Sequence, residues 1–153
     1  MRLNLKAVSG ALGLTAALVV CGPVLAGGAY NDDSADFRRV EPSNADMTLI
    51  RESGRWRVLI RAGGLPNGAA TAADCELQAR GAQDRDDVIH ARIIPFEGEI
   101  NDLTAADIGA DAPVIRVRVG PEGAFVEDGA AAARFCGMGS DITGFYTRSQ
   151  TPD

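Results

Sequence analysis

The chemistry available to this sequence is narrow, and His90 is the first residue to consider because it is the only histidine among 153 residues. A histidine oriented by a carboxylate can activate a serine nucleophile. However, the sequence has no Gly-x-Ser-x-Gly motif, and Ser140 in Gly-Ser-Asp lacks the spacing of a nucleophile elbow. We interpret His90 as a surface residue, assign no catalytic residue, and predict that the protein is not an enzyme.

Metal and cofactor sites are not indicated either. The acidic groups within 84–87 and 102–111 lack the glycine and terminal glutamate of an EF-hand. Glu97 and Glu99 are two residues apart and could form a carboxylate pair, but the only tryptophan, Trp56, lies far from them in the sequence, so a glycosidase site is not indicated. The glycines of 137–139 are not followed by the lysine of a phosphate-binding loop. We therefore predict no metal ion and no cofactor.

Five arginines are the candidate binding residues. They alternate with apolar residues in the two clearest strand patterns, so they share the outward face of those strands: Arg55, Arg57, Arg61, Arg116 and Arg118. If the two strands are neighbours, these arginines make a cationic patch that could bind a carboxylate or a phosphate. In the alternative interpretation they are the solvated face of a sheet, neutralised by carboxylates such as Glu52 and Glu76.

The first 26 residues have the composition of an export signal. Arg2 and Lys6 give a positive start, and an apolar stretch over 7–20 is too short to cross a bilayer comfortably. Ala26 supplies a small residue before the expected cleavage. We predict a signal peptide over residues 1–26 and a periplasmic or secreted protein, and no later stretch predicts a transmembrane span.

Two cysteines remain after this signal, and they predict one disulfide between Cys75 and Cys136. A metal site or a redox pair is the weaker alternative, because the sequence has no Cys-x-x-Cys motif. Closing a loop of this length removes on the order of 4 kcal/mol of unfolded-state entropy. Cys21 also allows a lipid anchor, which the bulky Val20 before it disfavours.

The charge of the chain limits its partners. The formal net charge is −6, and removal of Arg2 and Lys6 leaves 13 basic residues, all arginine, against 21 acidic ones, a net charge of −8. An acidic domain without a basic stripe is a poor ligand for nucleic acid or anionic membranes. It suits a basic protein partner through electrostatic steering, although solubility alone explains the charge as well.

The clearest element that positions these residues is a β-hairpin over 47–62. A two-residue Ser-Gly loop at 53–54 would pair Glu52 with Arg55, and this pairing would continue residue by residue along both strands. This register places five large side chains on one face, Met47, Leu49, Trp56, Val58 and Ile60. One face of the hairpin is therefore expected to be buried and the other solvated.

The rest of the sequence also has a period of two. Further strands are expected at 75–80, 88–94, 114–119, 124–127 and in the closing stretch 135–148. One helical turn, capped by Asp102, is expected over 103–108. We predict an all-β fold, a small antiparallel barrel or sandwich of six to eight strands over residues 46–150, after a polar N-terminal extension over 27–45.

The final strand pattern, Gly144-Phe145-Tyr146-Thr147-Arg148 after Cys136, together with Cys75 and the signal, resembles the C-type lysozyme inhibitors of bacterial periplasms. The resemblance implies an eight-stranded antiparallel barrel. It also implies a loop rich in Ser, Gly and Tyr with a following lysine, which enters the lysozyme active site. This sequence has no lysine after Lys6 and no counterpart of that loop, so the resemblance assigns no functional residue.

These patterns together lead to three functional expectations. The first is an exported, non-enzymatic binding domain of the Gram-negative envelope, whose partner is a basic protein or another envelope component. The second is an inhibitor of a basic envelope hydrolase such as lysozyme. The third is a barrel that holds a small apolar ligand in its mouth.

Overall fold

The computed structural model of the protein describes residues 34–64 and 74–149. The expected signal peptide and Cys21 lie outside the described residues. Among those that are described, no helix has both the length and the apolar character needed to cross a membrane.

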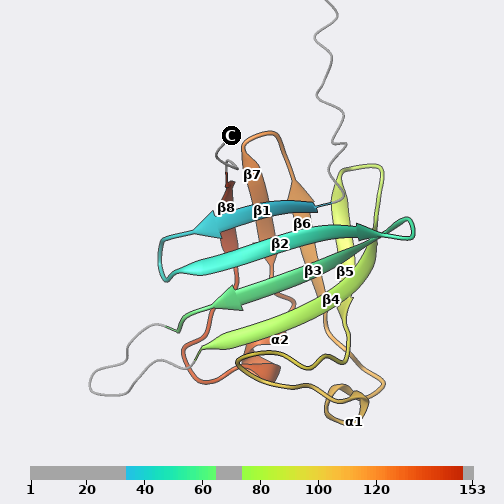
Figure 1. The fold of residues 1–153 in the computed structure, drawn as a ribbon, viewed down its shortest axis with the longest axis vertical. Helices are drawn as coiled ribbons and strands as arrows, with labels where there is room; N and C mark the ends of the chain where they lie inside the picture. Colours follow the sequence, from blue (N-terminus) through green and yellow to red (C-terminus); the bar gives the residue numbers. More distant parts are fainter. Residues whose placement is uncertain (1–33, 65–73, 150–153) are drawn as a thin grey trace, which may run out of the picture.

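Eight antiparallel strands form a closed barrel in which each strand pairs with the next one in the sequence and β8 pairs with β1 (Figure 1). The strands are β1 (Ser34–Arg39), β2 (Ala45–Glu52), β3 (Arg55–Ala62), β4 (Cys75–Gln83), β5 (Val88–Ile93), β6 (Val114–Val119), β7 (Gly123–Glu127) and β8 (Gly144–Arg148). The all-β prediction is confirmed, and closure into a barrel excludes the sandwich. Closure gives each of the eight described strands a neighbour on both sides.

The β2–β3 hairpin has the predicted register. Glu52 pairs with Arg55, and the pairing continues back to Ala45 opposite Ala62. Ser53 has φ 50° and Gly54 has φ 78°. Two positive φ angles at the central residues are typical of the turn that follows the twist of a two-residue hairpin.

The first strand corrects the expectation of a polar extension over 27–45. Residues 34–39 of that segment form β1, which pairs with β2 and β8 and closes the barrel. Phe37 is 1 % exposed and belongs to the core. The sequence pattern of β1 is hard to recognise, because the inward residue that follows Phe37 is Arg39, and arginine is rarely buried without partners.

Arg39 is buried at the end of β1 and has several acceptors. Its guanidinium donates to the Thr143 carbonyl, to the Asp141 carbonyl at 2.5 Å and to the Ser43 side chain. It also lies 5.3 Å from the ring centroid of Tyr146 in β8. Arg39 therefore ties β1 to the segment that leads into β8, which satisfies a buried charge with hydrogen bonds.

The barrel interior is filled by side chains. The inward residues of the strands form one cluster, among them Met47, Val58, Leu77, Ile89, Ile115, Val117, Val126 and Tyr146, each no more than 1 % exposed. A closed barrel of eight strands has an interior just wide enough for such packing. The Tyr146 hydroxyl donates to the Ile142 carbonyl at 2.8 Å, and burial raises its pKa to about 12.

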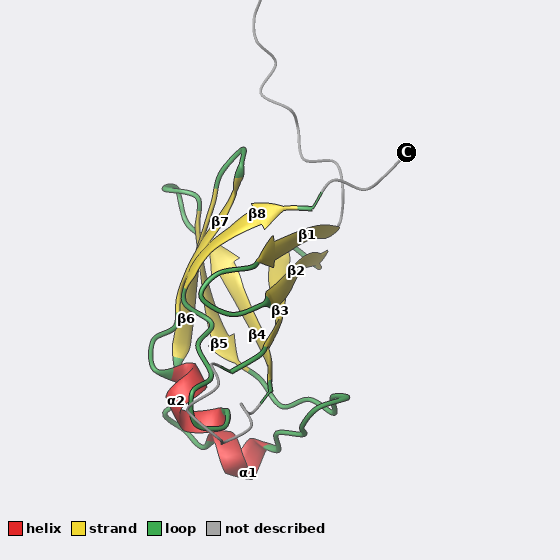
Figure 2. Cartoon of the chain, turned by 90° about the vertical axis from the view of Figure 1, so that its left-hand side faces the viewer, coloured by secondary structure: helices red, strands yellow, loops and turns green. Residues whose placement is uncertain are grey.

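One end of the barrel carries two short helices and the disulfide, and we call it the closed end (Figure 2). The helices are α1 (Ala105–Ile108) and α2 (Ala131–Phe135). The predicted bond between Cys75 and Cys136 is present and joins β4 to the residue after α2. The expected cap of α1 is wrong, because Thr104 caps the helix with Asp107 in a capping box, whereas Asp102 accepts from the Gly98 amide.

Candidate functional site

A hollow of about 490 Å³ lies on the outer face of β5, β6 and β7, beside the turn that joins β4 to β5. These strands run side by side along one flank of the barrel (Figure 2). The hollow is lined by Asp84, Asp86, Asp87, Val88, His90, Arg116, Arg118, Phe125 and Glu127. We call it the groove. Four carboxylates, two guanidiniums and one imidazole line it, so its formal charge is negative.

The β4–β5 turn places Asp84 against His90. The Asp84 Oδ1 accepts the amides of Asp86 and Val88, each at 2.9 Å, and Asp84 Oδ2 lies 2.8 Å from His90 Nε2. The Val88 amide and then the His90 side chain lower the pKa of Asp84 below its usual value of 3.8. Asp84 therefore stabilises the turn and orients the imidazole at the edge of the groove.

The opposite wall of the groove is formed by β6 and β7. Arg116 makes an ion pair with Glu127 at 2.5 Å. Arg118 is exposed and pairs across the strands with Phe125, which is 42 % exposed. A large, exposed aromatic side chain next to a guanidinium offers apolar contact area on an otherwise charged surface.

Phe125 also pairs with Phe145 of β8, which is 51 % exposed. The Phe145 ring lies over Gly123, where an added Cβ would come within 2.7 Å of it. Of these two exposed cross-strand neighbours, Phe125 lines the groove, and Phe145 lines a second hollow of about 460 Å³ together with Val40 and Thr147. Apolar area of this kind on a charged surface is typical of contact sites.

The chemistry that the groove can perform is limited by its lining. The Asp84–His90 pair resembles the base of a catalytic triad, but the lining contains no serine, threonine, cysteine, tyrosine or lysine to serve as a nucleophile. Within residues 34–64 and 74–149, no group of three or more histidine, cysteine and acidic side chains could hold a metal ion. The arrangement is suited to binding through charge and aromatic contact.

The structure does not bring the five predicted arginines together. β3 and β6 are separated by β4 and β5, so the condition for a single patch is not met. Only Arg116 and Arg118 line the groove. Arg57 makes an ion pair with Glu52 at 3.4 Å. Arg55 lies exposed beside the hairpin turn, where it pairs across the strands with Glu52.

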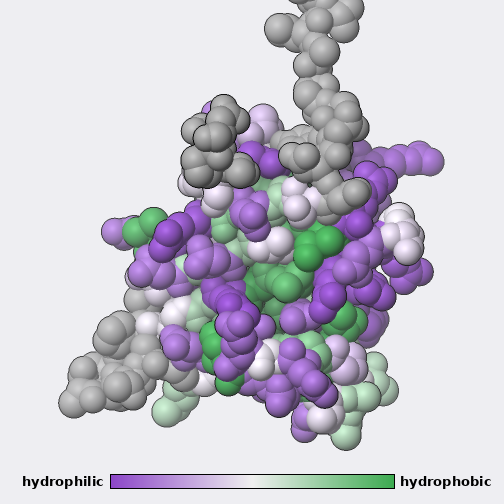
Figure 3. All heavy atoms as spheres, in the orientation of Figure 1, coloured by the Kyte–Doolittle hydropathy of each residue, from purple (hydrophilic) through white to green (hydrophobic). Residues whose placement is uncertain are grey.

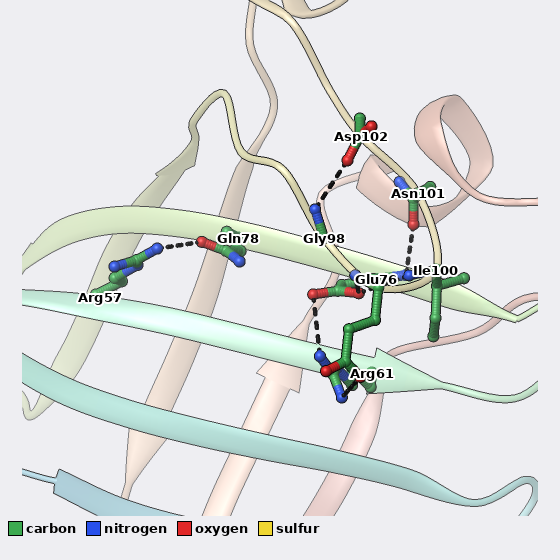
Figure 4. A network of polar contacts seen from close by, with 9 residues as sticks. Arg57, Arg61, Glu76, Gln78, Gly98, Ile100, Asn101 and Asp102 are labelled. Atoms are coloured by element: carbon green, nitrogen blue, oxygen red, sulfur yellow. Dashed lines mark hydrogen bonds and ion pairs between the residues drawn. The ribbon is translucent and has the colours of Figure 1, made fainter.

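Arg61 of β3 belongs to a network of ion pairs and hydrogen bonds around Glu76 of β4, which the alternation of the sequence does not predict. The alternation of the strand expected at 75–80 gives Glu76 outward parity, but Glu76 is 3 % exposed because residues 97–102 cover it (Figure 4). Its Oε2 accepts the amides of Glu99 at 3.0 Å and Ile100 at 3.1 Å, and its Oε1 lies 3.5 Å from Arg61. Glu99 also pairs with Arg61, at 2.9 Å. This network holds a loop in place.

Two signals in the sequence could have indicated the groove. Asp84 lies between the strands expected at 75–80 and 88–94, six residues before His90. Phe125 and Phe145 have the outward parity of their strands, between inward residues such as Val126 and Tyr146. An aromatic residue at an outward position is a stronger indication of a contact site than an arginine there, because outward arginines are common.

Comparison of the chain with protein-family models, curated proteins and solved structures finds no match.

Proposed function

We propose that this chain is an exported, non-enzymatic binding domain that holds a basic protein partner in the groove on β5–β7. The observation that carries the proposal is the open acidic rim of the groove beside the exposed ring of Phe125. Among the described residues, no donor lies within hydrogen-bond distance of the Asp86 carboxylate, and the Asp87 carboxylate accepts only from Gln83, at 3.3 Å. These carboxylates are available to a lysine or arginine of a partner.

The net charge of the chain supports the same partner class. At −6 for the full chain, and −8 without the expected signal, the protein attracts basic proteins over distances of about a Debye length. The aromatic side chain adds the apolar contact that most interface anchors supply. Charge would thus speed the encounter, and Phe125 would supply much of the binding energy.

Inhibition of a basic envelope hydrolase such as lysozyme is the second candidate. The eight-stranded barrel is the architecture that the resemblance to the C-type lysozyme inhibitors implies, and the acidic groove is complementary to a basic enzyme. The small-ligand barrel is not favoured, because side chains fill the interior.

Binding to hen-type lysozyme, used as a basic protein probe, tests the proposal by calorimetry in low salt. We expect Phe125→Ala and the pair Asp86→Asn with Asp87→Asn each to weaken binding about tenfold. Asparagine is chosen at position 87 because Asp87 has φ 59°, a conformation that asparagine tolerates well.

The matched control is the pair Asp36→Asn with Asp46→Asn, which removes two exposed carboxylates from β1 and β2 instead. A control that weakens binding as much as the groove pair would mean that net charge alone attracts the probe. A turbidity assay of lysozyme activity in the same samples separates binding from inhibition, and bound but fully active lysozyme would exclude the inhibitor.

A further inference from the structure

Two hollows of opposite charge lie next to each other on the outside of the barrel. The groove is acidic, whereas the second hollow is lined by three arginines and one glutamate, Arg38, Arg39, Arg148 and Glu41, so its formal charge is positive. β7, which carries Phe125 of the groove, pairs with β8, and β8 pairs with β1 (Figure 2). The two hollows are therefore neighbours on the barrel wall.

An apolar row joins the two hollows. Phe125 of the groove pairs across the strands with Phe145 of the second hollow, and Val40 also lines the second hollow. These side chains are 42 %, 51 % and 66 % exposed, and they are three of the six large apolar side chains that are exposed in the described residues. We call them the apolar row. Exposed apolar area gathered in one place is typical of a contact surface.

The face over β1 to β4 is different. Hydrophilic residues surround a small apolar centre there (Figure 3), and its outward apolar side chains Ile50 and Leu59 are only partly exposed. The apolar row is therefore a local feature of β7, β8 and the residue that follows β1. It lies where the charge of the barrel surface changes sign.

Arg38 is the cation of the second hollow that a partner can reach. Its side chain is 61 % exposed and lies 3.6 Å from the exposed Asp46, an ion pair that contributes little because water screens it. Arg39, by contrast, is buried and donates to acceptors within the chain. In the groove, Asp86 is exposed, and its carboxylate meets no donor among the described residues. Exposed charges of opposite sign thus flank the apolar row.

A surface with this order of features is complementary to itself. In a two-fold symmetric dimer the same patch serves both copies, so that each half of the patch meets the other half on the partner. An axis parallel to the strands, between β7 and β8, would place Phe125 of each copy against Phe145 of the other. It would also place each groove against the second hollow of the other copy, so that opposite charges meet on both sides of the buried apolar row.

We propose that the apolar row is the centre of a symmetric dimer of this chain, in which Asp86 of each copy faces Arg38 of the other. The dimer covers the groove, so self-association competes with the basic partner, but the inference does not depend on that partner. The negative net charge opposes the meeting of two copies, and an ionic strength of about 0.15 M screens this repulsion beyond about 8 Å. A contact centred on three side chains of each copy gives a weak dimer, with a Kd of about 100 μM.

Sedimentation equilibrium of the protein alone tests the dimer, between about 10 μM and about 1 mM at that ionic strength. We expect the average molar mass to rise from that of the monomer towards twice that value. Phe145→Ala should raise the Kd about tenfold, because it removes an aromatic side chain from the centre of the contact. The control Met138→Ala removes an apolar side chain that is 95 % exposed outside the row, and it should change the Kd less than about twofold.

A charge exchange tests the arrangement of the two copies. Arg38→Glu and Asp86→Arg should each raise the Kd about fivefold, because each places like charges opposite one another. The two changes together restore opposite charges and should return the Kd to within about twofold of its original value. The proposal is overturned if the combined variant dimerises no better than the single ones, or if the protein stays monomeric at about 1 mM, which would leave the apolar row to a different protein. Failure to bind lysozyme would contradict the proposed function alone, since sedimentation uses no partner.

Discussion

The closed end of the barrel and the groove each use a carboxylate on or beside β4 to hold a loop. At the closed end, Glu76 accepts two amides of the segment 97–102 and pairs with Arg61. At the groove, Asp84 accepts two amides of its own turn and contacts His90. The chemistry of the two contacts is similar.

Burial is the difference between them. Glu76 is 3 % exposed, whereas the side chain of Asp84 is 38 % exposed. A buried carboxylate depends on every one of its partners, because water cannot replace them. An exposed one exchanges partners with water at little cost. The closed end is therefore expected to determine stability, and the groove can meet a partner without loss of the fold.

The strongest test of this contrast is Glu76→Ala. The change leaves the amides of Glu99 and Ile100 without their buried acceptor, whereas Arg61 keeps its ion pair with Glu99. We expect the free energy of unfolding to fall by about 2–3 kcal/mol, because two loop amides are left without a hydrogen-bond acceptor. Denaturant unfolding measures it.

Asp84→Ala is the matched variant at the groove, and its effect on the same unfolding curve should be much smaller. Equal destabilisation by the two variants would contradict the contrast. Gly98→Ala offers an independent check at the closed end, since an added Cβ there would lie 2.7 Å from the carboxyl carbon of Glu76. That variant should also be destabilised, by displacement of the loop.

The pH dependence of stability tests the effect of burial at a second group, Tyr146. Its pKa is about 12 in the folded protein and about 10 when unfolded. Below pH 10 both states hold the proton, so stability does not depend on this group. Between pH 10 and 12 the unfolded state loses the proton first, and stability should fall by about 2–3 kcal/mol. Denaturant unfolding at several alkaline pH values measures the fall.

Tyr146→Phe is the control for this pH dependence. It removes the bond to Ile142 and lowers stability at neutral pH, but it should abolish most of the alkaline decrease. If the variant loses stability between pH 10 and 12 as steeply as the original protein, another group is responsible.

The sequence predicted those features of the fold that depend on local alternation. The hairpin register and the inward side chains of β5 and β6 follow from a period of two. The disulfide follows from the pairing of the two cysteines that remain after the expected signal. These features need no knowledge of which strands are neighbours.

The features that the sequence did not predict depend on contacts between distant segments. Glu76 and Gln78 have outward parity but are buried, because a loop some twenty residues later covers one of them. The two strand patterns that carry the five predicted arginines are not neighbours, and the strand order instead places Arg57 beside Arg80 and Arg80 beside Arg92. Alternation assigns a face to each residue, but it does not show what covers that face.

The smallest expected effect concerns the exposed carboxylate of the groove, and it is a change in the pKa of Asp84. Its folded value lies below 3.8, mainly because of the Val88 amide and secondarily because of His90. A carboxyl group whose pKa is lowered by folding stabilises the protein at pH values above its pKa in the unfolded state. This contribution disappears as the pH falls through its pKa in the folded state. His90→Asn should therefore raise the pKa of Asp84 only part of the way towards 3.8. Carboxyl ¹³C titration measures it, and a complete return to 3.8 would show that His90, rather than the turn, holds the carboxylate.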